Sequence, residues 1–74
     1  MMTQIDKKEV GKRLKSFREV RGLSRAALAL KLSLTEAELE EIEAGKKQLS
    51  KDGIETLRET FSVDPAWLLG AQEP

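Results

Sequence analysis

The chain has 74 residues, of which 13 are basic and 13 acidic, and it contains no cysteine and no histidine. This composition excludes a disulfide framework, the usual zinc sites and Ser-His catalysis, so we expect no metal, no cofactor and no enzymatic activity. The apolar stretches are short and interrupted by charge, which argues against a transmembrane segment or a secretory signal. We therefore expect a cytoplasmic protein that folds as a single small domain over residues 1–74.

Five helices are predicted from one recurring start signal. At each start, a capping residue follows an apolar residue and precedes another apolar residue by four positions, which is the hydrophobic staple around an N-cap. The five capping residues are Asp6, Ser24, Thr35, Ser50 and Asp64. The predicted helices span 6–21, 24–32, 35–44, 50–61 and 64–69, and a frayed tail follows at 70–74. With no strand pattern present, the predicted fold class is all-α, a five-helix bundle.

Further signals refine two helix starts and two helix ends. Glu38 lies three positions after Thr35, and Glu9 lies three positions after Asp6, which is the spacing of a capping box. Gly22 and Gly45 stand where a residue in the left-handed conformation would end the first and third helices.

Apolar residues at helical spacing predict the core. They are Val10, Leu14, Phe17, Leu28, Ala29, Leu32, Leu39, Ile42, Ile54, Leu57 and Phe61, with Trp67 and Leu68 closing the bundle from the last helix.

Residues 24–44 form the predicted helix-turn-helix. In that layout a first helix lies across the DNA backbone and a second helix enters the major groove. Here the second helix is acidic, with glutamates at 36, 38, 40, 41 and 43. The net charge of zero is made of blocks, +6 over 1–31, −5 over 32–45, +3 over 46–51 and −4 over 52–74. Any basic footprint for DNA must therefore be local.

Taken together, these motifs resemble the phage Cro/repressor type of helix-turn-helix domain, also called the xenobiotic-response-element family. The resemblance is carried by GKRLKSFREVRGLS at 11–24, by Ala29 and Leu39, by IEAG at 42–45 and by VDPAWLLG at 63–70. It implies a five-helix, DNA-binding fold.

The resemblance also implies roles for individual residues. The base-reading positions of the family fall on Glu36, Ala37, Glu40 and Glu41, with Ala44 behind them. Arg25 occupies the place of a phosphate-contacting glutamine, and Lys46, Lys47 and Lys51 are expected to add phosphate contacts. In relatives, the glutamate that matches Glu43 pairs with an arginine that matches Arg18. The turn position that is commonly glycine is Ser33, which fits if its backbone keeps ordinary dihedral angles.

Two functions remain open. The first is a sequence-specific DNA-binding regulator that binds double-stranded DNA as a homodimer, with an interface formed by Val63, Pro65, Trp67 and Leu68. The alternative is a helix-turn-helix domain reused as a protein-interaction module, adaptor or antitoxin-like, whose acidic helix faces a basic protein partner. A glutamate in the groove can accept from the cytosine amino group, but it adds little affinity beside phosphates, so the cations must supply the binding energy.

Overall fold

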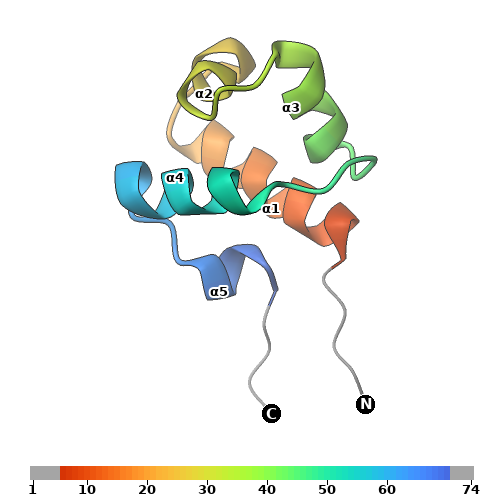
Figure 1. The fold of residues 1–74 in the computed structure, drawn as a ribbon, viewed down its shortest axis with the longest axis vertical. Coiled ribbons are helices and arrows are strands. Elements are labelled where there is room, and N and C mark those ends of the chain that lie inside the picture. The colour runs from red at the N-terminus through yellow and green to blue at the C-terminus, as the bar shows by residue number, and fades with distance from the viewer. Residues whose placement is uncertain (1–5, 71–74) are drawn as a thin grey trace.

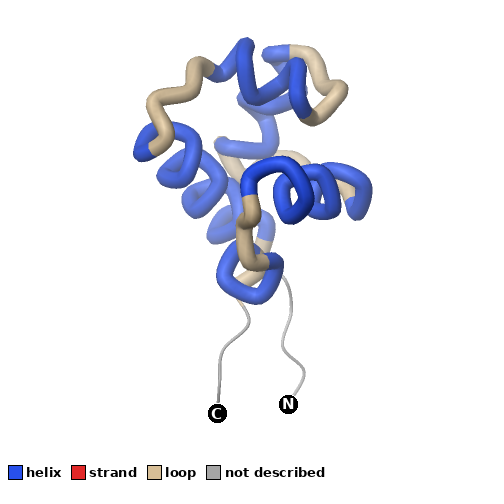
Figure 2. The backbone as a smooth tube through the Cα atoms, turned by 90° about the vertical axis from the view of Figure 1, so that its left-hand side faces the viewer, coloured by secondary structure: helices blue, strands red, loops and turns tan. Residues whose placement is uncertain are grey.

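The computed structural model describes residues 6–70 as five helices joined by short loops. They are α1 (Lys7–Val20), α2 (Arg25–Lys31), α3 (Glu36–Glu43), α4 (Lys51–Phe61) and α5 (Pro65–Leu68). Figure 2 shows no strand among these residues, so the predicted all-α class and all five helices are confirmed. Ile5 of the first predicted staple and residues 71–74 of the predicted tail lie outside the described residues. Gly70 is described; it is half-buried, and its N–H donates to the Trp67 carbonyl.

All five predicted N-caps are confirmed, because each capping side chain accepts a hydrogen bond from a backbone N–H two or three residues later. The capping box of Thr35 and Glu38 is also present. The second predicted box is wrong: Asp6 caps α1, but the Glu9 carboxylate pairs with Lys12 and Arg13 at 3.9 and 3.8 Å.

Helix α1 is the element on which the others are arranged (Figure 1). Helix α3 packs against both α1 and α2, and α5 packs against α1. Phe17 of α1 and Phe61 of α4 make an edge-to-face contact with ring centroids 5.4 Å apart. Helices α2 and α3 lie together at one end of the molecule, away from α5.

Every predicted core residue except Trp67 is buried or half-buried. The predicted Leu14, Leu28, Leu39 and Leu57 are completely buried, and Phe17, Ile54 and Phe61 are half-buried against the core. Leu49 and Val63 were not predicted and are also buried.

The prediction that Trp67 closes the core is wrong, because this residue is 47% exposed. Adjacent residues of a helix point about 100° apart, so a helix of one turn can present only one of two neighbours to the core. In α5 that residue is Leu68.

Gly11 sets the distance between α1 and α3. A Cβ atom at this position would collide with the backbone carbonyl oxygen of Ile42 and would lie 2.8 Å from that of Glu43. The backbone of α1 therefore touches the last turn of α3, and this contact fixes where α3 lies.

Candidate nucleic-acid interface

The turn between α2 and α3 is closed by its backbone. The N–H of Leu34 donates to the carbonyl of Ala29 at 2.8 Å, and buried Ala29 leaves room for the two helices to approach. Ser33 lies in this turn with φ 59°, in the left-handed region. The condition of ordinary dihedral angles at Ser33 is therefore not met: the turn keeps the conformation that glycine would adopt most easily.

Leu39 and Ile42 bury one side of α3 and leave the opposite side to solvent. We call Ala37, Glu40, Glu41 and Ala44 the outer face of α3; all four are exposed, as is Glu36. With Lys46, the outer face lines a shallow depression of about 280 Å³. Within residues 6–70, the carboxylates of Glu36, Glu40 and Glu41 have no hydrogen bond or ion pair. All four predicted base-reading positions are thus exposed, and the three carboxylates among them have no hydrogen bond or ion pair within residues 6–70.

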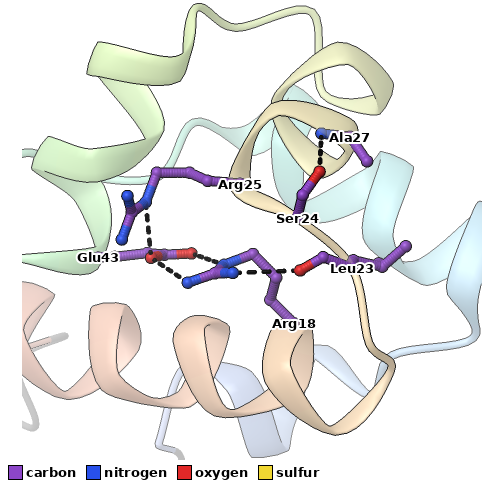
Figure 3. A network of polar contacts seen from close by, with 6 residues as sticks. All are labelled: Arg18, Leu23, Ser24, Arg25, Ala27 and Glu43. Carbon is purple, nitrogen blue, oxygen red and sulfur yellow. Dashed lines mark hydrogen bonds and ion pairs between the residues drawn. The ribbon is translucent and has the colours of Figure 1, made fainter.

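The predicted ion pair between Arg18 and Glu43 is present and buried (Figure 3). Arg18 Nε donates to Glu43 Oε2 at 2.7 Å, and Arg18 Nη2 donates to Oε1 at 3.1 Å. Arg18 Nη1 also donates to the Leu23 carbonyl at 3.1 Å, which links the pair to the loop before α2. The hydrogen bonds from Arg18 to Glu43 raise the pKa of the arginine further, so its guanidinium stays charged. This contact joins α3 to α1.

Arg25 shares the same carboxylate, which the sequence did not predict. Its Nε lies 3.4 Å from Glu43 Oε1, and its side chain is 35% exposed, whereas that of Glu43 is 3% exposed. Figure 3 shows Glu43 between the two arginines, with Arg25 reaching across from the start of α2. The predicted phosphate contact is thus a cation that is already oriented by a buried anion.

The lysines after α3 lie in different surroundings. Lys47 Nζ is 3.5 Å from Glu38 Oε2, Lys46 borders the outer face of α3, and Lys51 begins α4 as an exposed residue. Glu38 also accepts the N–H of Thr35 at 2.9 Å. The pKa of Glu38 therefore lies below its usual value. The largest cause is the hydrogen bond from the Thr35 backbone, and the next is the positive charge of Lys47.

A second depression, of about 210 Å³, adjoins the first at Glu40 and Ala44 and is also lined by Lys15 of α1, Arg25 of α2 and Glu43. Sequence reasoning missed Lys15. It stands three residues before Arg18, and this spacing places both on neighbouring parts of one helix face. The pairing of Arg18 with Glu43 was therefore the signal that could have located Lys15 beside α3.

The four predicted dimer residues divide by exposure. Val63 and Leu68 are buried in the domain, at 7% and 1% exposed, whereas Pro65 is half-buried and Trp67 is largely exposed. Only Pro65 and Trp67 therefore offer surface to a partner.

Over residues 6–70, no group of three or more acidic side chains is arranged to hold a metal ion. In the same part of the chain, no helix has the length and apolar character needed to cross a membrane.

A family model described as a helix-turn-helix domain matches residues 11–73. Among solved structures, the chain is similar to the apo form of the competence regulator ComR from Streptococcus vestibularis, with 31% sequence identity and a TM-score of 0.75. The match covers 90% of this chain but only 23% of the ComR chain, so it spans less than a quarter of that protein. A comparison with curated proteins gave no match.

Proposed function

The chain belongs to the helix-turn-helix domain family, and on that basis we propose that it is a DNA-binding transcription regulator that inserts α3 into the major groove. The likeness to a competence regulator supports this assignment. We further propose that it binds a two-fold operator as a homodimer.

One observation carries the proposal: the exposed outer face of α3 has cations on both sides. Arg25 lies on the α2 side, and Lys46 and Lys47 lie beyond the last turn. A helix in the major groove has a phosphate backbone on each side, so this spacing suits phosphate contacts that flank base contacts. Arg25, Lys46, Lys47 and Lys51 are the proposed phosphate contacts.

The glutamates of the outer face fit a reading role better than an affinity role. Glu40 and Glu41 can accept hydrogen bonds from the amino group of cytosine, and Ala37 leaves room for a base edge. Glu36, at the first position of α3, suits the positive end of the helix dipole and also faces solvent. Affinity then depends on the cations, and Arg25 and Lys47 already have anionic neighbours, so we expect moderate affinity with strong dependence on salt.

The test is fluorescence anisotropy with duplexes from the region upstream of the protein's own gene, across a salt series. Arg25→Ala and Lys47→Ala should each weaken binding to every sequence and lower the salt slope by about one unit. Arg58→Ala removes the same charge from α4, where Arg58 pairs with Glu55, and should leave the slope unchanged. A Lys46→Ala/Lys47→Ala variant that behaves like wild type on every duplex would contradict the proposal.

A second candidate function rests on the unpaired carboxylates of Glu36, Glu40 and Glu41. Three exposed anions on one helix would suit a basic protein partner. Under the DNA proposal, Glu40→Gln or Glu41→Gln should raise non-specific affinity and shift preference away from cytosine. If the helix binds a basic protein, the same changes should weaken that complex and leave DNA binding unaffected.

A further inference from the structure

Two cations, Lys15 and Arg25, line the second depression, and one of its two carboxylates, Glu43, is already paired with Arg18. Arg18 already satisfies both oxygens of Glu43, through bonds of 2.7 and 3.1 Å. The contact of Arg25 with Glu43 is longer, at 3.4 Å, and Arg25 is much more exposed than Glu43. Lys15 has no ion pair within residues 6–70, and Glu40 is the only other acid lining the depression. Within residues 6–70, Lys15 therefore has no anionic partner and Arg25 has only the longer contact, so both side chains can bind an anion from outside the domain.

The geometry of Arg25 leaves its terminal nitrogens available. Its contact to Glu43 uses Nε, and no hydrogen bond from Nη1 or Nη2 occurs within residues 6–70. A guanidinium fixed by its Nε keeps the donors that suit a phosphate oxygen, and fixing it beforehand lowers the entropy lost on binding.

We propose that Lys15 and Arg25 together hold one phosphate of the DNA backbone on the α1 side of α3, and that Glu43 is the positioning residue that holds Arg25 for it. This inference rests on the proposed DNA binding. It adds Lys15 as a DNA-binding residue, and it gives Glu43 the role of positioning Arg25 in addition to its ion pair with Arg18.

The contribution of Lys15 can be tested with a fluorescein-labelled duplex of mixed sequence, about 20 base pairs long, because phosphate contacts do not depend on sequence. Lys15→Gln should weaken binding several-fold at low salt and lower the salt slope by about one unit. Lys12→Gln is the matched control: it lies one turn earlier on α1, pairs with Glu9 and does not line the depression. Its slope should equal that of wild type.

If Glu43 positions Arg25, removing the negative charge of Glu43 should weaken DNA binding instead of strengthening it. If Glu43 acted on DNA only through its charge, Glu43→Gln would remove a repulsive anion and tighten binding. If it positions Arg25, Glu43→Gln should weaken binding, and the weakening should disappear when Arg25 is already alanine. Affinities are compared at a temperature at which circular dichroism shows each variant folded. If Glu43→Gln does not fold, Arg25→Lys replaces it: this variant keeps the charge but lacks Nε, and should weaken binding while retaining the wild-type salt slope.

The outcomes separate the two proposals. A wild-type protein that binds no duplex at any salt concentration overturns both the DNA-binding function and the phosphate site. Salt-dependent binding that Lys15→Gln and Lys12→Gln change equally overturns the role of Lys15 alone. Tighter binding by Glu43→Gln, or wild-type affinity in Arg25→Lys, overturns the positioning role alone.

Discussion

Two serines of this domain adopt backbone angles that usually belong to glycine. Ser33, in the turn before α3, and Ser62, at the end of α4, both have φ 59°. A side chain at such an angle costs about 1 kcal/mol because its Cβ crowds the neighbouring carbonyl oxygen. The turn that leads into α3 therefore carries a local strain that another residue could relieve.

We predict that Ser33→Gly raises the free energy of unfolding by about 0.5–1 kcal/mol, because glycine removes this crowding. Ser16→Gly is the matched control: it makes the same substitution at an exposed position inside α1, where glycine should cost about 0.5–1 kcal/mol. Urea unfolding of the two variants and the wild type measures both changes in the free energy of unfolding. A destabilised Ser33→Gly would mean that the serine hydroxyl contributes more than the backbone angle costs.

Single residues also mark where sequence reasoning reached its limit. The pair of Arg18 and Glu43 could be predicted because the resemblance places both residues in known positions. The contacts of Arg25 with Glu43 and of Lys47 with Glu38 could not, since they depend on how three helices and a loop meet. The angle of Ser33 was missed because serine itself gives no signal for a positive φ.

At the scale of the helix, capping residues in the sequence predicted all five helix starts. The sequence did not predict where two helices pack closely together. The N-caps were predictable because each acts within three residues of its own chain. Gly11, in contrast, looks from the sequence like a weak position inside a helix. Its importance appears only when α3 lies against it.

We predict that Gly11→Ala destabilises the domain, although alanine is the better helix former by about 1 kcal/mol. The added methyl group would collide with the backbone of α3, which cannot move without loosening the pair of Arg18 and Glu43. Gly53→Ala is the control, because its new methyl group would meet mainly the flexible end of the Leu49 side chain, at 2.8 Å. The stability of this variant should equal or slightly exceed that of the wild type. Thermal unfolding followed by circular dichroism compares the two; equal effects would contradict the close contact of α1 and α3.

The capping box of α3 predicts a dependence on pH. The folded pKa of Glu38 lies below its unfolded value, so its contribution is complete above the usual glutamate pKa of about 4.3 and is lost as the pH falls through the folded pKa. Glu38→Gln keeps an uncharged acceptor for the Thr35 N–H, and should remove this part of the acid sensitivity. The melting temperatures of both proteins between neutral and strongly acidic pH provide the measurement. Parallel curves would show that the Glu38 charge does not stabilise α3.

At the scale of the whole molecule, the proposed homodimer would use the exposed surface of α5. The chain has one tryptophan, and it is 47% exposed beside half-buried Pro65. Val63 and Leu68, the other two residues predicted at the interface, are buried inside the domain. Since a single domain contacts one half-site, and the half-sites of a two-fold operator are about 34 Å apart, a partner domain is expected here.

We predict a dimer by sedimentation equilibrium at tens of micromolar, and a blue shift of the Trp67 fluorescence as it forms. Trp67→Ala should give a monomer whose stability falls only slightly, because much of the side chain is exposed. Leu30→Ala removes an exposed apolar side chain from α2 and should leave the dimer intact. A wild-type protein that is monomeric with and without DNA would contradict the prediction.

The outer face of α3 is separate from everything that keeps α3 in place. Helix α3 is held by Leu39, Ile42 and Glu43, by its capping box and by the contact with Gly11. The side chains of Ala37, Glu40, Glu41 and Ala44 take no part in this, and substitutions at such surface positions usually change stability by less than about 0.5 kcal/mol. These four residues can therefore be substituted with little effect on the stability of the domain. One scaffold could give rise to a series of domains with different binding preferences, and exchanging these four residues between relatives is a direct route to reprogramming them.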